Sequence, residues 1–251
     1  MRIILVLICG LFSVIVQAQS PEDSPAAGAV SGQGQPITLT TAIGTTLQGY
    51  VAGPDDARRG ILLLHDRWGL NRVMRARVEQ FARRGYRALA IDVFDGRASD
   101  EFRLATEIMN ATDPEWVKTD VLAGVNYLQV EGRQVAVMGW GYGGWQAFQA
   151  GLMASQPVDA IVVGYGDMDM TPEQVRLLRS PVLGVFARYD PNITPEEVDA
   201  YRINLRKGFA FYDLQVLDGD HGFADPLYPT YNEALAQRAW DMVDRFLDAH
   251  L

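Results

Sequence analysis

Two residues that can act as acid and base, and one glycine-rich turn that we call the glycine corner, lie in segments of the chain where a hydrolytic site would need them. Asp190 lies in FARYDPNITPE, His221 lies in LDGDHGFADP, and the glycine corner GWGYGG occupies 139–144. A histidine that is oriented by a carboxylate can take a proton from a nucleophile or from water. The order corner, acid, histidine is the one in which one class of hydrolases arranges its nucleophile, acid and base. We therefore predict a catalytic site that contains Asp190 and His221.

The glycine corner fits two patterns that carry different chemistry. Gly139, Gly141 and Gly144 match G-x-G-x-x-G, the loop that brings a dinucleotide to a helix N-terminus. The same letters match G-x-S-x-G, the corner that presents a nucleophilic serine, with Gly141 in place of the serine. A dinucleotide loop belongs to the first strand–helix unit and is followed about 20 residues later by an acidic residue. Here the corner follows several such units and the nearest acid, Asp167, comes late, so the hydrolase pattern is favoured.

Strands and helices alternate along the chain and place these residues at strand ends. Apolar, β-branched runs predict strands, and apolar residues at helical spacing predict helices. The predicted strands are 61–65, 86–94, 134–138, 158–164, 181–187 and 209–217, with an antiparallel hairpin at 37–54. The predicted helices are 71–85, 100–110, 114–130, 143–154, 194–207 and 233–250. This alternation predicts an α/β fold with a mainly parallel central sheet and helices on both faces, whose chemistry gathers beyond the carboxyl ends of the strands.

The N-terminus predicts export. Residues 1–18 combine Arg2, an apolar run, and Val16 and Ala18 at the small-residue positions of a signal-peptidase site. The apolar run is shorter than the about 20 residues that a membrane span needs. We therefore predict a cleaved signal peptide, an exported protein that is periplasmic or secreted, and no stable membrane anchor after cleavage.

The rest of the chain divides into a leader and one domain. Residues 19–36 are rich in Ser, Pro, Gly and Ala and predict a flexible leader, and 37–251 is long enough for one α/β domain. The formal charge of −9 is a poor match for nucleic acid. The three histidines have no metal-ligand spacing, so we expect no metal, and we expect no cofactor.

Four segments resemble the dienelactone hydrolase family. They are the block at 62–97, which begins LLLHDRWG, the corner VAVMGWGYGGWQA, the acid loop FARYDPNITPE and the histidine loop LDGDHGFADP. The resemblance covers most of 37–251, with the motifs in family order. It implies an α/β-hydrolase fold and a small-molecule ligand or substrate of the ester or lactone class.

The resemblance also implies roles for individual residues. The family's cysteine nucleophile falls on Gly141, and its aspartate and histidine fall on Asp190 and His221. The oxyanion hole would be formed by the backbone N–H groups of Arg67 and Tyr142. Glycine has no atom to acylate, so acyl-enzyme hydrolysis is not expected.

Other loop residues are expected near the cleft. The family's glutamate beside the resting thiol corresponds to Asp66, whose alternative role is a structural cap or ion-pair partner. The family's substrate-binding arginine is replaced by Asp225, which argues against an anionic ligand. The residues predicted to line the cleft are Asp66, Trp68, Arg97 and Trp140.

Two functions follow from these assignments. In the first, the domain has lost acyl-enzyme catalysis and binds a small ligand or a partner in the old cleft. In the second, His221, held by Asp190, activates a water in the space that the nucleophile has left, and the protein hydrolyses small esters or lactones. A nucleotide-dependent oxidoreductase is a third, less favoured hypothesis.

Overall fold

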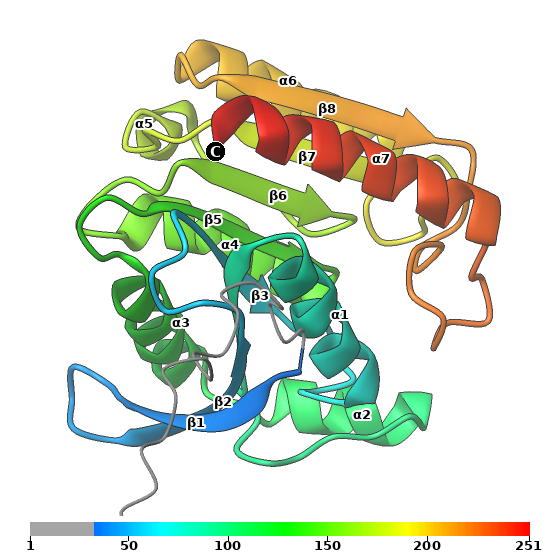
Figure 1. Cartoon of the computed structure of the whole chain (residues 1–251). Coiled ribbons are helices and arrows are strands. Elements are labelled where there is room, and N and C mark those ends of the chain that lie inside the picture. Colours follow the sequence, from blue (N-terminus) through cyan, green and yellow to red (C-terminus); the bar gives the residue numbers. More distant parts are fainter. Residues whose placement is uncertain (1–32) are drawn as a thin grey trace, which may run out of the picture.

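The structure, a computed structural model, describes residues 33–251 and is built around one eight-stranded sheet (Figure 1). The strands are β1 (Gln35–Thr40), β2 (Thr46–Ala52), β3 (Arg59–Leu64), β4 (Tyr86–Ile91), β5 (Gln134–Trp140), β6 (Ala160–Gly164), β7 (Val182–Ala187) and β8 (Tyr212–Leu217). They lie in the order β1-β2-β4-β3-β5-β6-β7-β8. β1, β2 and β4 pair antiparallel, and all the other pairs are parallel.

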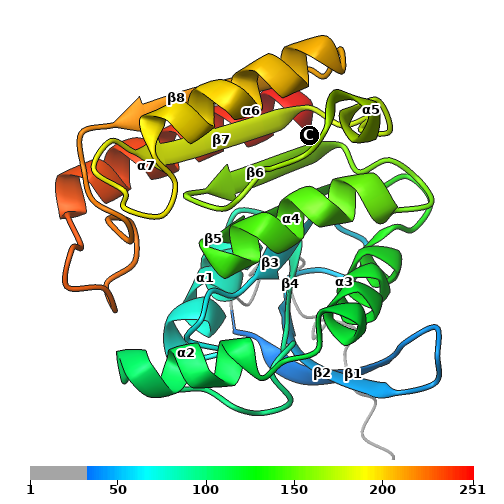
Figure 2. The same ribbon diagram turned by 180° about the vertical axis from the view of Figure 1, so that it is seen from behind.

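Helices cover both faces of the sheet. They are α1 (Arg72–Arg83), α2 (Phe102–Asn110), α3 (Pro114–Leu128), α4 (Tyr142–Met153), α5 (Pro172–Val175), α6 (Pro195–Lys207) and α7 (Glu233–His250). One apolar core lies beneath α1 and α7, which face the viewer in Figure 1. A second core lies beneath α3, α4 and α6, which face the viewer in Figure 2. β4, β6 and β7 are buried along their whole length because helices cover both of their faces.

Local signals in the sequence determine where the helices begin. The side chain of Asn71 accepts hydrogen bonds from the first turn of α1, and Asp113 does the same for α3, which starts with Pro114. Thr194 and Glu197 form a reciprocal capping box at the start of α6. The caps of α1 and α6 thereby fix the loops that follow β3 and β7.

The predicted fold is confirmed, and the element boundaries differ by a few residues. The hairpin, the six further strands and the six helices are all present, and α5 is an additional short helix. β1 begins at Gln35, so the last two residues of the predicted leader belong to the sheet. The predicted signal peptide, 1–18, and most of the leader lie outside the described residues. Within 33–251, no helix is both long and apolar enough to cross a membrane.

The glycine corner allows α4 to pack closely against the sheet. A Cβ on Gly143 would lie 2.1 Å from the carbonyl oxygen of Leu64, and a Cβ on Gly139 would lie 2.2 Å from the carbonyl carbon of Gly143. Side chains at these positions would push α4 away from the carboxyl ends of β3 and β5. These two glycines therefore allow backbone atoms to approach closely. This close approach places the start of α4 beside the loop that follows β3.

Candidate active site

Gly141 forms a sharp turn between β5 and α4. Its backbone has φ 55° and ψ −120°, a left-handed conformation that glycine adopts at little cost and that strains other residues. Its N–H donates to the carbonyl oxygen of Gly164 at 2.8 Å, which fixes the turn to β6. The turn has the position and the strained conformation of a nucleophile elbow, and it carries no nucleophile.

His221 and Asp190 form the acid–base pair that the sequence predicts. Nδ1 of His221 lies 2.7 Å from Oδ2 of Asp190, whose side chain is fully buried. The other carboxylate oxygen accepts from the backbone of Asn192 at 2.8 Å and of Ile193 at 3.1 Å. The carboxylate therefore holds the proton on Nδ1, which leaves Nε2 free to act as a base. Nε2 is buried and makes no hydrogen bond to any residue within 33–251.

The carboxylate of Asp66 occupies the predicted oxyanion hole. Its Oδ1 accepts from the backbone N–H of Arg67 at 2.7 Å and from that of Tyr142 at 2.9 Å. These are the two donors that the family resemblance assigns to the hole. Tyr142 is the first residue of α4, so the carboxylate also lies at a helix N-terminus, where negative charge is stabilised. This contact matches the alternative role considered for Asp66 in the sequence analysis, that of a structural helix cap.

Tyr228 satisfies the second oxygen of the same carboxylate. Its hydroxyl donates to Oδ2 of Asp66 at 2.7 Å and accepts from Nε of Arg67 at 3.0 Å. Burial and the adjacent charge of Asp66 raise the pKa of Tyr228 well above its usual range, so this hydroxyl keeps its proton. Asp66 is only 5% exposed, and a buried carboxylate is stable only when such donors surround it.

His65 holds the backbone of the loop that carries Asp66. Its Nδ1 lies 2.8 Å from the carbonyl oxygen of Asp66, and its Nε2 accepts from the backbone N–H of Val93 at 3.2 Å. Since Nε2 is the acceptor, Nδ1 carries the proton and donates to the carbonyl. Burial lowers the pKa of His65, which keeps the ring neutral. His65 is therefore a structural residue of the loop.

Gly141 and Asp66 exclude any larger residue at the elbow. A Cβ built on Gly141 would lie 2.5 Å from Oδ1 and 2.7 Å from Cγ of Asp66. Contacts this short are repulsive, so a cysteine or serine at this position requires the carboxylate to move. The absence of a side chain at Gly141 and the position of the Asp66 carboxylate therefore depend on each other.

A cleft of about 710 Å³ opens beside the elbow and His221. Its aromatic lining residues are Tyr142, Trp145, Tyr165 and Tyr201, and its acidic lining residues are Asp167, Asp169 and Glu197. Aromatic walls favour an apolar ligand, and the carboxylates repel an anion. Arg67 also lines this cleft, and Asp225 does not, so the charge of the cleft depends on these three acids and on Arg67.

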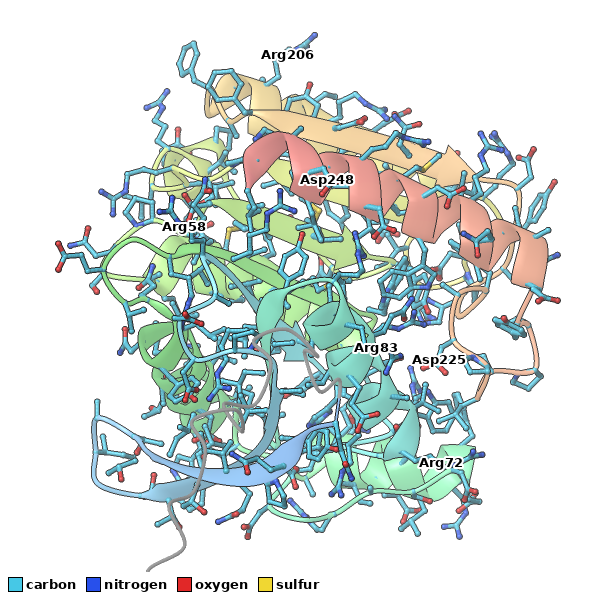
Figure 3. All side chains as sticks on the ribbon, viewed as in Figure 1. Arg58, Arg72, Arg83, Arg206, Asp225 and Asp248 are labelled. Atoms are coloured by element: carbon cyan, nitrogen blue, oxygen red, sulfur yellow. The ribbon has the colours of Figure 1, made fainter. Side chains whose placement is uncertain are left out.

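The four residues predicted to line the cleft lie elsewhere, which corrects that prediction. Asp66, Trp68 and Trp140 line a second cavity of about 50 Å³ on the other side of the elbow, together with Asp225. Arg97 is exposed and lines a separate surface hollow. The indole rings turn inward because burying their large apolar surface is favourable. Figure 3 shows Asp225, which belongs to the loop that joins β8 to α7, on the side of that loop that faces α1.

Asp225 is a carboxyl group in this second cavity whose pKa is raised. Burial is the main cause that raises its pKa to about 6, and the charge of Asp66 adds to the shift. The backbone N–H of Leu227, which donates at 2.9 Å, and the charge of Arg77 lower the pKa. Three or more His, Cys, Asp or Glu side chains arranged to hold a metal ion are not found in the described part of the chain.

The geometry of the elbow, the acid–base pair and the two backbone donors agrees with the comparison to known families. A model of the dienelactone hydrolase family matches residues 47–251. The chain belongs to the dienelactone hydrolase family. Solved structures to which the chain is similar include one named a dienelactone hydrolase, from Klebsiella pneumoniae subsp. pneumoniae, with a TM-score of 0.71 at 19% identity, covering 86% of this chain and 98% of that one. The chain has the α/β-hydrolase fold.

Relatives of this dienelactone hydrolase family member are distant in sequence. A Saccharolobus solfataricus protein named a carboxymethylenebutenolidase is 24% identical over 248 residues, covering 81% of this chain and 94% of that protein. A dienelactone hydrolase-like promiscuous phosphotriesterase from metagenomic libraries has a TM-score of 0.74 at 22% identity, covering 87% of this chain and 99% of that one. At such identities the solved structures show the fold alone.

Two tyrosines of the site are absent from the sequence-based assignment. Tyr228 is the partner of Asp66 and Arg67, and Tyr165 lines the cleft with its ring centroid 4.9 Å from that of His221. Tyr165 directly follows β6, and Tyr228 lies in the loop between β8 and α7, after the histidine, so their positions in loops that follow strands were the available signal. Tyrosine is so common in packing that this signal alone does not separate them from core residues.

Proposed function

We propose that this chain binds a small, neutral, largely apolar molecule in the cleft and does not hydrolyse esters through an acyl-enzyme. The observation that carries the proposal is the position of Asp66, whose carboxylate accepts both backbone donors of the oxyanion hole. An ester carbonyl would have to displace a buried, fully hydrogen-bonded carboxylate to reach these donors. Gly141 then offers no atom to acylate.

The lining of the cleft supports a neutral ligand. Three carboxylates, those of Asp167, Asp169 and Glu197, line it beside the guanidinium of Arg67, so an anionic ligand meets a net negative charge. The name of the Saccharolobus solfataricus relative, a carboxymethylenebutenolidase, points to the lactone class, and a neutral ester or lactone is the ligand that we propose. The acidic balance of the chain supports the absence of nucleic acid among its partners.

Hydrolysis of short-chain esters and lactones tests the proposal. We expect no turnover above buffer from the unmodified protein, because Gly141 offers no nucleophile and Asp66 fills the hole, and little from Gly141→Ser, whose side chain conflicts sterically with the carboxylate of Asp66. Turnover is expected in Gly141→Ser/Asp66→Gly, in which His221 meets a nucleophile beside an open hole. Asp66→Gly alone is the matched control. It opens the hole without supplying a nucleophile, so turnover that needs both changes supports the proposal.

The second candidate function is hydrolysis through a water that His221 activates. The observation that favours it is the free Nε2 of His221, which Asp190 keeps available as a base. Turnover by the unmodified protein that is lost in His221→Ala would establish this function and contradict the first.

We also propose that the protein is exported. The support is the sequence of residues 1–18, with its apolar run and small residues before Gln19. N-terminal sequencing of the protein from its native host is expected to start at Gln19. A chain that still starts at Met1 would contradict export by cleavage.

A further inference from the structure

We propose that the loop between α6 and β8 docks on an anionic lipid surface, with two phenylalanines that insert into it. Phe209 and Phe211 are 82% and 83% exposed, the highest fractions among the exposed large hydrophobic residues of 33–251. At this exposure the rings keep most of their apolar surface in water, which is unfavourable unless another surface covers them. The inference goes beyond the proposed function, because it concerns a surface remote from the cleft.

The backbone at Phe209 is unfavourable for a phenylalanine. The N–H of Phe209 donates to the carbonyl oxygen of Arg206 at 3.2 Å. The N–H of Ala210 donates to that of Leu205 at 3.0 Å, and together these bonds end a helix with one left-handed residue. That residue is Phe209, with φ 63°, whereas Gly85 takes the same place after α1, with φ 86°. A bulky exposed ring thus stands where glycine suits the fold better, so its role lies outside the fold.

The segment between α5 and β7 lies beside this loop. A Cβ on Gly208 would lie 2.3 Å from Cγ1 of Val175, the last residue of α5. The N–H of Val182, at the start of β7, donates to the carbonyl oxygen of Phe211 at 3.0 Å. The segment that these two contacts hold against the loop contains a third apolar side chain, Leu177, which is 64% exposed. Three exposed apolar side chains therefore belong to one end of the molecule.

Four cations accompany these apolar side chains. They are exposed, and none forms an ion pair with another residue of 33–251: Arg176, Arg179, Arg206 and Lys207. Figure 3 shows Arg206 projecting from the surface at the end of α6. Within 173–179 and 206–213, which we call the docking patch, two carboxylates, those of Glu173 and Asp213, oppose the four cations. The docking patch is therefore positive, although the formal charge of the chain is −9.

An anionic lipid surface fits this combination of side chains. Apolar side chains enter the boundary between headgroups and acyl chains, and cations beside them are attracted to anionic headgroups. The remainder of the chain is acidic and is repelled by such a surface, so the docking patch is the part that faces it. A second copy of the chain is a less suitable partner, because it would bring four like charges against the same four cations.

The docking patch and the cleft lie at opposite edges of the sheet. Phe211 directly precedes β8, and Leu177 lies in the segment that leads into β7, so both lie at the amino ends of these strands. Asp190 and His221 follow the carboxyl ends of the same two strands. Figure 2 shows the arrowheads of β6 and β8 at the end of the sheet away from α5. A protein that docks by this patch therefore keeps its cleft open to the aqueous phase.

Flotation with lipid vesicles tests the inference. The protein used starts at Gln19, because the apolar run within residues 1–18 would itself enter a bilayer, and the strands and helices of the described fold all lie after it. We expect binding to vesicles of equal parts phosphatidylglycerol and phosphatidylcholine, and little binding to phosphatidylcholine alone. Raising the salt from about 0.1 to about 1 M should weaken the binding, because salt screens the cations.

Substitutions separate the contribution of the rings from that of the cations. Phe209→Gly should weaken vesicle binding by about tenfold or more, because one ring no longer leaves water. Glycine suits φ 63°, so this variant should unfold at the same temperature as the unmodified protein or at a higher one. Arg206→Gln/Lys207→Gln should weaken binding by about 10–30-fold, from the attraction of each cation to an anionic surface.

Matched controls remove the same kinds of side chain elsewhere. Trp116→Ser removes an aromatic on α3 that is 65% exposed. Arg72→Gln/Arg83→Gln removes two exposed cations of α1, which Figure 3 shows far from Arg206. Both variants should bind vesicles as the unmodified protein does.

A fluorescent label reports insertion directly. Cys9 is the only cysteine of the chain, so the protein that starts at Gln19 has none, and Phe211→Cys carries a single nitrobenzoxadiazole label. Its emission should shift to shorter wavelength on the anionic vesicles, and that of labelled Trp116→Cys should not. Absence of vesicle binding, binding that persists in Phe209→Gly/Phe211→Ser, or an unchanged emission of the label on Phe211→Cys would overturn the inference. Self-association in analytical ultracentrifugation that Phe211→Ser abolishes would also overturn it, and would assign the docking patch to a second copy of the chain.

Discussion

Oδ1 of Asp66 lies 2.9 Å from the backbone nitrogen of Tyr142, the first residue of α4. The contact joins the loop after β3 to the glycine elbow and places a negative charge at a helix N-terminus. In hydrolases of this fold, the N–H of the residue after the nucleophile stabilises the oxyanion of the intermediate. Here the carboxylate of Asp66 supplies a negative charge at this position, so the backbone N–H groups of Arg67 and Tyr142 are already hydrogen-bonded in the resting state.

Gly141 and Asp66 are expected to be energetically coupled. Gly141→Ala should lower the free energy of unfolding by about 1–3 kcal/mol, because φ is 55° and the new Cβ meets Oδ1 of Asp66 at 2.5 Å. In an Asp66→Gly background the steric conflict is removed, so the same substitution should cost only about 1 kcal/mol. Urea unfolding of the four proteins measures the coupling, about 0.5–3 kcal/mol for residues in contact. Additive effects would show that the two groups do not meet.

Tyr228 is expected to stabilise the buried carboxylate. Tyr228→Phe removes the donor to Oδ2 of Asp66 and the acceptor for Nε of Arg67. Leaving such groups unsatisfied should cost about 1–3 kcal/mol of unfolding free energy, measured in urea. Tyr231→Phe, at a tyrosine that is 42% exposed, is the control and should change little. Equal effects of the two substitutions would contradict the role given to Tyr228.

The fold and the acid–base pair were predictable because their signals are local. Strand runs and helix caps determine the elements, and parallel strands bring their carboxyl ends to one edge. Asp190 and His221 follow β7 and β8, so the topology alone brings their loops together, and the side chains lie 2.7 Å apart.

The position of the Asp66 carboxylate in the predicted oxyanion hole could not be predicted from local signals in the sequence. Whether Asp66 enters the hole depends on how closely α4 approaches β3, which is a tertiary contact made through Gly143. The direction of a side chain beyond a strand end is equally undetermined by sequence, so Trp68 and Trp140 were assigned to the wrong cavity. Packing of large apolar rings decided their orientation.

Gly143 is expected to control the approach of α4 to the site. In Gly143→Ala the new Cβ would lie 2.1 Å from the carbonyl oxygen of Leu64, so α4 must shift and the hydrogen bond from Tyr142 to Asp66 lengthens. We expect the free energy of unfolding to fall by about 1–3 kcal/mol, which is the range for overpacking of a tightly packed interior. Gly144→Ala, whose nearest contact would be 3.0 Å, should cost less. Thermal unfolding of both variants measures the difference, and equal losses would show that the close approach is not at Gly143.

Asp225 is expected to make stability fall as pH rises. Burial raises its folded pKa to about 6 from an ordinary value of 3.8, so the folded state binds its proton more tightly than the unfolded state. The stability that this provides is fully present below about pH 4 and is lost as the pH rises through about 6. Asp225→Asn keeps an acceptor for Leu227 and abolishes the loss. Between pH 4 and pH 8, the free energy of unfolding of Asp225→Asn, measured in urea, should therefore rise relative to that of the unmodified protein by on the order of 1–3 kcal/mol. Asp100→Asn, at an exposed carboxyl, is the control and should show no such gain. If the difference in unfolding free energy between Asp225→Asn and the unmodified protein stays constant with pH, the pKa of Asp225 is not raised. If this difference shrinks as the pH rises, the pKa of Asp225 is shifted in the opposite direction.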